Sequence, residues 1–358
     1  MNPSVSICIP TFNGATYLAA CLDSALAQSF ADFEILIVDD RSSDETLTIA
    51  KEYATRDRRI RLVVNEKNLG LGGNWNRCVE LAQGEWIKFV FQDDSLEPGC
   101  LERMLAARTP DTVMISSRRS YIFDPSVPEV TQNAYLRDIA HFSLAHFFHG
   151  KTDISAKDYC AVTLNHLGDN FVGEPTGLML HRSVFYRFGV FNPYLIHSCD
   201  FEFWTRVAVH TGIIYVPETL TRFRVHPDSA SASNKGPRKY RAFVLDELVL
   251  LHDYAFHPVY APLRAAAADH RPAVDLAKWL STKSHAARRI AERAAVHPVN
   301  PTPHLLAEWN ELLQSYPLLG QFSQRSLVTR LTEHGCEWPK HVGLQVKAFF
   351  KLARPLQK

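Results

Sequence analysis

The first hundred residues alternate between short apolar runs and helical patterns, and this alternation constrains the fold more than any other feature. The apolar runs are short enough to be buried strands, at 5–9, 33–38, 60–64 and 86–91. Residues with apolar side chains at helical spacing lie between them, at 15–29, 44–56 and 74–81. The order predicts right-handed crossovers and a mostly parallel sheet with helices on both faces.

Polar clusters follow three of these predicted strands. They are Thr11-Phe12-Asn13, Asp39-Asp40 and Gln92-Asp93-Asp94. Ligands of open α/β sheets bind outside the carboxyl ends of the strands, so the three clusters are expected to share one site. Three polar clusters from distant parts of the sequence, all placed at strand ends, indicate a ligand site more strongly than any one of them would.

The rest of the chain is less regular until about residue 239. Residues 110–172 show no readable pattern, 177–181 and 213–216 resemble strands, and 200–210 a helix. The small, polar segment 229–238 marks a domain boundary. Helical patterns follow at 239–256, 261–270, 272–294, 303–315 and 324–334. We therefore expect an α/β domain over 1–235 and a helical domain over 236–358.

Composition excludes several classes of protein. A hydrophobic share of 46% and a charged share of 22% indicate a globular chain, and a net charge of +1 gives no general attraction to nucleic acid. The seven cysteines include no C-x-x-C pair. We see no signal peptide and no apolar run long enough to cross a bilayer, so a cytoplasmic location is expected.

Two stretches resemble a known family. VSICIPTFNGATYLAACLDSALAQSFADFEILIVDDRSSDET and NLGLGGNWNRCVELAQGEWIKFVFQDD resemble the signature blocks of family 2 glycosyltransferases, and the similarity covers roughly residues 3 to 228. The resemblance implies a Rossmann-like, glycosyltransferase A-type α/β fold. It also implies a nucleoside-diphosphate sugar donor, a divalent cation and inversion at the anomeric carbon.

The resemblance assigns the donor to the strand ends. Asp40 is expected to accept the N3–H of a uracil-like base, which favours a UDP- or dTDP-linked sugar. The alternative is that a strand-end carboxylate only caps the next helix. The expected donor-binding residues are Pro10, Thr11, Asn13, Asp39, Asp40, Asn68, Gly70, Arg77, Gln92 and Asp93.

A Mn²⁺ or Mg²⁺ ion is expected between the carboxylates and the diphosphate. The resemblance places Asp94 and His226 at the metal and gives Asp93 a sugar or ribose contact. Gln92 replaces the family's first aspartate and removes one charge from the site. Without the resemblance, adjacent acidic residues after a strand would equally indicate a solvated turn.

An inverting transfer needs one base to take the acceptor's hydroxyl proton. Asp200 matches the family's base, Cys199 stands where a glutamate often precedes it, and Glu202 is the rival. Asp200 could instead be only a helix N-cap. Acceptor contacts are expected from Glu174, Glu202 and Trp204, although a core position for Trp204 is the more ordinary interpretation.

The sequence thus predicts a metal-dependent inverting glycosyltransferase that acts on a hydroxyl of a glycan or lipid-linked acceptor, in cell-surface polysaccharide synthesis. The alternatives are a non-catalytic glycan-binding or scaffold protein on the same fold, and a sugar nucleotidyltransferase. Residues 340–354 resemble a basic interfacial helix, which predicts peripheral contact with the inner face of the membrane; the alternative is that this helix packs onto the protein's own core. The transferred sugar, the acceptor and the linkage do not follow from the sequence.

Overall fold

The computed structural model describes residues 2–229, 243–296 and 303–323. The chain divides into two compact units, Met1–Asp275 and Leu276–Lys358. Residues 243–275 belong to the first unit, whereas the sequence analysis assigned them to the helical domain. The division at residue 235 therefore differs from this one and stays a prediction.

The first unit is built on a nine-stranded sheet with the order β3-β2-β1-β4-β8-β6-β9-β5, and β7 pairs with β9. β1 to β4 run parallel, as do β6 and β9, whereas β8 is antiparallel to both of its neighbours and β5 and β7 are antiparallel to β9. The predicted α/β class with mostly parallel strands is confirmed. The strands are β1 (Val5–Thr11), β2 (Phe33–Asp39), β3 (Ile60–Val64), β4 (Trp86–Phe89), β5 (Ser95–Leu96), β6 (Met114–Phe123), β7 (Asp153–Ile154), β8 (Leu178–His181) and β9 (Ile213–Val225).

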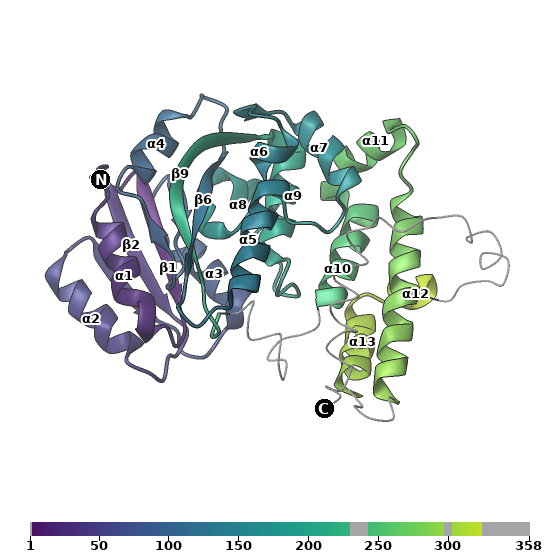
Figure 1. Cartoon of the computed structure of the whole chain (residues 1–358), viewed down its shortest axis with the longest axis horizontal. Coiled ribbons are helices and arrows are strands. Elements are labelled where there is room, and N and C mark those ends of the chain that lie inside the picture. Colours follow the sequence, from purple (N-terminus) through teal and green to yellow (C-terminus); the bar gives the residue numbers. More distant parts are fainter. Residues whose placement is uncertain (1, 230–242, 297–302, 324–358) are drawn as a thin grey trace. The chain divides into compact units, whose positions relative to one another are not determined.

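Helices cover both faces of this sheet (Figure 1). The α-helices of the first unit are α1 (Ala15–Leu26), α2 (Thr46–Arg56), α3 (Gly70–Leu81), α4 (Cys100–Ala106), α5 (Glu129–His141), α6 (Leu144–Phe147), α7 (Ala156–Asn165), α8 (Ser183–Phe188), α9 (Cys199–Thr211), α10 (Phe243–Phe256) and α11 (Ala261–Asp269). Two short 3₁₀ turns, η1 (Pro175–Gly177) and η2 (Pro258–Tyr260), complete the unit.

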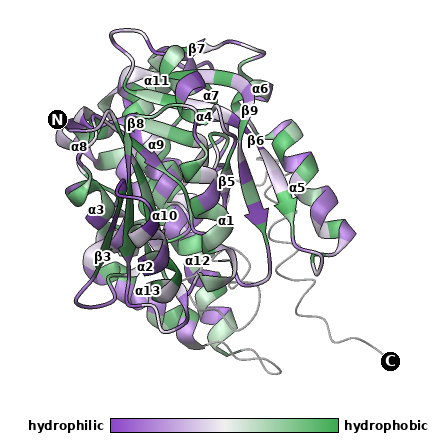
Figure 2. Cartoon of the chain, turned by 90° about the vertical axis from the view of Figure 1, so that its left-hand side faces the viewer, coloured by the Kyte–Doolittle hydropathy of each residue, from purple (hydrophilic) through white to green (hydrophobic). Residues whose placement is uncertain are grey.

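The central strands are apolar on both sides, as buried parallel strands must be (Figure 2). Ile7 and Ile9 point into the main apolar cluster, where they meet Leu18 and Leu22 of α1. Cys8, between them, points to the opposite face and reaches the carbonyl oxygen of Cys78 on α3. Because successive side chains of β1 point to opposite faces, α1 and α3 pack on opposite faces of the sheet. The ends of the strands are then left for the loops to cover.

The structure extends two predicted strands. β1 continues through Pro10 to Thr11, because its pairing with β4 ends at Cys8 and the missing N–H of proline breaks no bond of that ladder. β9 runs to Val225, well beyond the predicted 213–216, and this carries it past the site. The unreadable region 110–172 contains β6, α5, α6, β7 and α7.

The second unit contains α12 (Leu276–Ala295), α13 (Pro303–Ser315) and α14 (Leu318–Phe322). Leu280 and Ala287 of α12 are buried, as are Trp309 and Leu312 of α13. Among the described residues, no helix has the length and apolarity that crossing a membrane requires. The helix predicted at 324–334 and the interfacial helix predicted at 340–354 lie outside the described residues.

Candidate functional site

The carboxyl ends of β1 and β2 bring the first two polar clusters side by side. Thr11 is the register partner of Asp39, and the N–H of Asp40 donates to the Thr11 carbonyl oxygen at 2.8 Å. Gln92, in the loop after β4, meets the same edge through the backbone of Phe12. The structure therefore brings together the three clusters that the sequence placed at strand ends.

Asp39 holds the two loops in place. Its carboxylate accepts from the hydroxyl of Thr11 at 3.1 Å, and from the backbone N–H and hydroxyl of Ser42 at 2.9 and 2.5 Å. The side chain is fully buried. Asp39, predicted as a donor-binding residue, is thus directed inward and bonds to the protein's own loops.

Asp40 binds the glycine-rich loop. Its carboxylate accepts from Asn65 Nδ2 at 2.8 Å and from the backbone N–H groups of Leu69 and Gly70 at 2.8 and 2.9 Å. Gly70 has a φ of +73°, which favours glycine at the start of α3. A carboxylate has about four acceptor positions, so Asp40, which is 2% exposed, can accept one further hydrogen bond.

Asn68 and Asn13 shape these loops rather than standing free. Asn68 Nδ2 donates to the carbonyl oxygen of Asp40 at 2.9 Å. Asn13 has a φ of 49° and its Oδ1 accepts from the backbone N–H of Ser43 at 2.8 Å. Both side chains fix the backbone at the edge of the sheet that the donor was predicted to approach.

Gln92 has a structural reason to be glutamine. Its Oε1 accepts from the N–H of Phe12 at 2.9 Å and its Nε2 donates to the Phe12 carbonyl oxygen at 3.1 Å. An aspartate could not donate the second bond. A Cβ at Gly14 would lie 2.1 Å from Gln92 Oε1, so the close approach needs glycine there. The residue that removes a charge from the predicted metal site thus joins the loops after β1 and β4.

Asp93 faces His226 at the end of β9. Their Oδ2 and Nε2 atoms are 2.9 Å apart, and the imidazole packs edge-on against Tyr17 at 4.7 Å between ring centroids. Nδ1 of His226 is buried and has no hydrogen-bond partner within the described chain. Arg224 donates to the Asp93 carbonyl oxygen at 2.8 Å and lies over the Tyr17 ring. One carboxylate and one imidazole therefore converge where the diphosphate was predicted.

Asp94 does not share this arrangement. It is 1% exposed, and its carboxylate accepts from the backbone N–H of Arg224 at 2.9 Å and from the Thr176 hydroxyl. Burial and the nearby charge of Asp93 raise the pKa of Asp94 well above its ordinary value. Lys88, fully buried, donates to the carbonyl oxygen of Thr176, and burial lowers its pKa to about 8. The metal role predicted for Asp94 fits this geometry poorly, because protein groups hold both of its oxygens.

Asp200 begins α9 without capping it. The N-cap position is Ser198, and the Asp200 carboxylate accepts only from the N–H of Phe201, at 2.7 Å, among the residues that the structure describes. Burial and the nearby Glu174 raise its pKa to about 7, although the N–H of Phe201 opposes the shift. Glu174 itself pairs with Arg119 at 2.5 Å. A carboxylate with spare acceptor capacity and a pKa near neutrality suits a general base.

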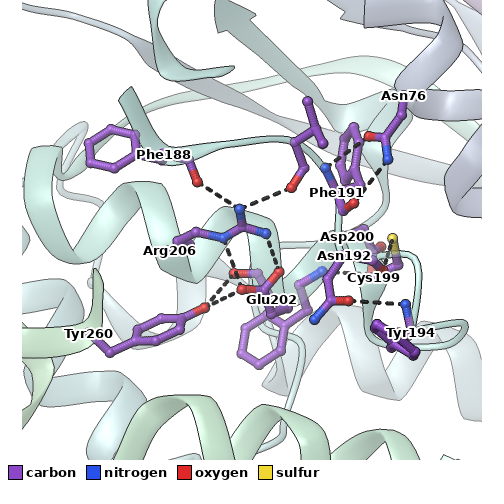
Figure 3. A network of polar contacts seen from close by, with 12 residues as sticks. Asn76, Phe188, Phe191, Asn192, Tyr194, Cys199, Asp200, Glu202, Arg206 and Tyr260 are labelled. Atoms are coloured by element: carbon purple, nitrogen blue, oxygen red, sulfur yellow. Dashed lines mark hydrogen bonds and ion pairs between the residues drawn. The ribbon is translucent and has the colours of Figure 1, made fainter. Parts of the chain in front are cut away.

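Glu202 and Trp204 belong to the core instead, which corrects the acceptor roles predicted for them. Glu202 makes a two-point pair with Arg206 at 3.0 and 2.6 Å and accepts from the Tyr260 hydroxyl at 2.5 Å (Figure 3). It is 2% exposed. Trp204 is fully buried and its indole donates to the Gly173 carbonyl oxygen, so it offers no ring face to a sugar.

The remaining predicted residues contribute little chemistry of their own. Arg77 pairs with Glu80 one turn along α3 at 2.7 Å, and Pro10 is buried within β1. The sequence analysis missed Lys88 and Arg119. Lys88 could have been found, because a single lysine inside an apolar strand indicates a buried charge. Arg119 lies in the region 110–172, which showed no pattern.

Comparison with known proteins identifies relatives of the part of the chain that carries the first strand-end clusters. Residues 6–165 match the model of glycosyl transferase family 2. An uncharacterized protein of Mycobacterium tuberculosis is 31% identical over 221 residues, which are 62% of this chain and 66% of that protein. A putative glycosyltransferase EpsH of Bacillus subtilis is 39% identical over 114 residues, 32% of this chain and 33% of its own. The alignments thus span two thirds or less of these relatives' own lengths.

Solved structures show the same fold. A crystal structure of S. aureus TarS 1-349 in complex with UDP-GlcNAc superimposes with a TM-score of 0.56. The match covers 88% of this chain and 81% of that one, at 16% sequence identity. At this identity the likeness establishes the fold and not the ligand.

Proposed function

The chain belongs to glycosyl transferase family 2, and on that premise we propose that it transfers a sugar from a nucleoside-diphosphate sugar to an acceptor hydroxyl, with inversion. The observation that carries the proposal is Asp200. Its carboxylate stands at the start of α9 with one backbone hydrogen bond and a pKa raised to about 7. General bases work best when their pKa lies near the pH of the reaction.

The donor we propose is UDP- or dTDP-linked. Asp40 keeps one acceptor position after its three internal hydrogen bonds, and the N3–H that uracil and thymine share needs a single acceptor. The TarS structure contains UDP-GlcNAc, which supports a uridine donor by analogy of fold. The residues around Asp40 would then position the base and ribose.

For the divalent cation we propose Asp93 and His226, in place of Asp94. No cluster of three or more potential ligands from His, Cys, Asp and Glu occurs in the described parts of the chain. Mg²⁺ at phosphate sites uses one or two carboxylates and takes its other ligands from water and phosphate, so a site this small fits. The pair of Asp93 Oδ2 and His226 Nε2, 2.9 Å apart, marks where the ion would be held. Bound Mn²⁺ or Mg²⁺ would supply positive charge for the leaving diphosphate.

The chain's own residues account for the remaining steps. Asp200 accepts the proton of the acceptor hydroxyl while that oxygen attacks the anomeric carbon. Arg224 lies over the Tyr17 ring and donates to the Asp93 carbonyl oxygen. Its guanidinium would lie beside the diphosphate of the donor. Gln92 and Asp39 hold the loops rigid, and pre-positioned groups lower the barrier to a displacement of this kind.

A donor panel tests the proposal. UDP-, dTDP-, GDP- and ADP-sugars with Mn²⁺ are scored by thermal shift and by release of the nucleoside diphosphate. We expect UDP or dTDP species to raise the melting temperature and to be turned over slowly without an acceptor. Stabilisation by GDP-sugars alone would overturn the base assignment. No stabilisation and no release with any donor would favour a scaffold protein on the same fold.

The cellular setting is a separate proposal. Synthesis of a cell-surface polysaccharide, from the cytoplasmic side and with membrane contact through 340–354, follows from the family resemblance and from residues outside the described part of the chain. Deleting 340–358 should lower binding to anionic liposomes without changing hydrolysis of the donor. Unaltered liposome binding would count against the membrane contact.

A further inference from the structure

A cavity of about 330 Å³ lies between β6 and α5, and the proposed transfer does not use it. Cavities of this size can hold a small organic group. Most of the wall is carbon, and Arg118, Arg119 and three serines supply its polar part. The larger apolar and aromatic side chains are Tyr121, Leu136, Ile139, Leu144, Val172 and Tyr215. No carboxylate lines it. Its chemistry thus differs from that of the donor edge, where carboxylates dominate.

Helix α5 covers this cavity and contacts β6 through Tyr135, whose ring lies edge-on to Tyr121 at 5.4 Å between centroids. None of its 13 residues is buried, and Leu136 is 49% exposed although it lines the cavity. A surface helix ordinarily buries an apolar stripe against the core. Figure 2 shows α5 beside β6, with hydrophobic and hydrophilic residues both present along it. Its apolar residues Leu136 and Ile139 meet the cavity instead of a packed neighbour.

The cavity is connected to the proposed base through Arg119 and Glu174. Arg119 of β6 lines it and pairs at 2.5 Å with Glu174, whose charge acts on Asp200. The segment from Val172 to Glu174 leads from the cavity wall to that pair. Gly173 has a φ of +111°, and a Cβ there would lie 2.3 Å from Arg119 Nη1, so the close approach requires glycine.

This segment is also tied to the helix that carries the base. The indole of Trp204 on α9 donates to the Gly173 carbonyl oxygen at 3.3 Å. A group bound in the cavity would therefore be held on the same rigid frame as Asp200. The continuity places the cavity on the acceptor side of the reaction and away from the strand ends that face the donor.

We propose that this cavity is an acceptor subsite for an apolar group, aliphatic or aromatic, attached to the sugar whose hydroxyl reacts. The proposal rests on the transfer reaction proposed above. Because carbon makes up most of the wall, a bare sugar would bury several hydroxyls without hydrogen bonds, which is unfavourable. An apolar group gains from the same wall, because each buried methylene raises affinity by roughly fourfold.

Methyl and n-octyl β-glycosides of glucose, galactose and N-acetylglucosamine test the subsite. Their binding to the full chain is measured by calorimetry without donor, below the micelle concentration of the octyl compounds. We expect octyl glycosides to bind at least about 50-fold more tightly than methyl glycosides of the same sugar, the gain from about three buried methylenes. Equal affinity of the two series would overturn the subsite.

A matched pair of variants locates the binding. Ala140→Phe adds a ring to a residue that lines the cavity, and it should remove the preference for octyl glycosides. Ala134→Phe makes the same change on the same helix, at a residue outside the cavity lining, and should keep the preference. Melting temperature and circular dichroism confirm that both variants fold. Equal loss in both variants, or loss in neither, would contradict the assignment to this cavity.

Binding of UDP and of dTDP to the wild-type chain separates this proposal from the proposed function. If octyl preference is present and Ala140→Phe removes it while neither UDP nor dTDP binds, the apolar site stands and the transferase proposal fails. If UDP binds and the chain length of the glycoside has no effect, the transferase proposal stands and the apolar subsite is wrong.

Discussion

Carboxylates lie on both the donor side and the acceptor side of this unit, and the two sides differ in how many hydrogen bonds those carboxylates accept from the protein. Asp39, Asp40 and Asp94 each accept hydrogen bonds at both oxygens from neighbouring loops and strands. Asp200 accepts one, from its own helix, among the described groups. The comparison teaches that a strand-end carboxylate whose oxygens are occupied by protein donors, as in Asp39 and Asp94, can build a site without touching the ligand. Only a carboxylate with an unused acceptor position, as in Asp40 and Asp200, is left to bind one.

The largest expected effect is on the acceptor side. Asp200→Asn keeps the size of the side chain and its bond to the Phe201 N–H, but removes the proton acceptor. Transfer should fall by about 10²- to 10⁴-fold, while UDP affinity stays near the wild-type value. Rates of nucleoside-diphosphate release with acceptor measure this. Asp153→Asn, at an exposed position on β7, is the control and should transfer normally.

Glu202, two residues further along α9, tests whether a carboxylate on this helix stabilises the fold without taking part in the reaction. Glu202→Gln leaves the buried Arg206 without its charge partner, and breaking a buried pair costs about 3–5 kcal/mol of unfolding free energy. Denaturant unfolding should show this loss, while the folded fraction retains its transfer rate. A stable Glu202→Gln variant with no activity would make Glu202 the base and reverse the assignment.

Two neighbouring aspartates sharpen the comparison within the donor side. Asp93→Asn should weaken metal-dependent donor binding by more than tenfold, because it neutralises the carboxylate that faces His226. Asp94→Asn should leave metal dependence in place and instead lower stability by about 1–3 kcal/mol, through mismatched bonds to Thr176 and Arg224. Titration of Mn²⁺ with UDP, together with unfolding curves, measures both. The opposite pattern would restore the metal to Asp94.

The smallest expected effect concerns stability against pH. Because the pKa of Asp200 is about 7 in the folded chain and near 4 when unfolded, the folded state binds its proton more tightly. This stabilising contribution is complete below about pH 4 and is lost as the pH rises to 7. Asp200→Asn should thus be about 1–2 kcal/mol more stable than wild type at pH 8 and equal to it at pH 4. Melting curves at the two pH values would reveal any other pattern.

Local sequence patterns were enough to predict where the first four strands lie and which strand ends carry the polar residues of the site. The apolar runs located β1 to β4, and the polar residues that follow them meet at one edge because parallel strands end together. The family resemblance supplied Asp200 as a candidate base. These predictions depend on short-range periodicity and motif order, which a single sequence displays.

What the sequence could not supply depends on contacts between distant residues. Nothing local shows that Gln92 pairs with the Phe12 backbone, or that Asp94 bonds to Thr176 and Arg224. The sequence favoured a core position for Trp204 over a sugar-stacking one, and its complete burial decides between the two. The cavity under α5 lies in a segment whose helix buries none of its residues, so no apolar periodicity indicated it.

The pH dependence of transfer tests the central claim, that the ionised Asp200 carboxylate takes the acceptor proton, most directly. The measurement is kcat/KM of the wild-type chain from pH 5 to 9, with a saturating UDP-sugar donor and Mn²⁺. The account predicts a rate that rises tenfold per pH unit at low pH and levels off above about 7, where the raised pKa of Asp200 lies. In Asp200→Asn the residual rate should lose this limb. A flat wild-type profile across pH 7, or the same limb in Asp200→Asn, would contradict the account.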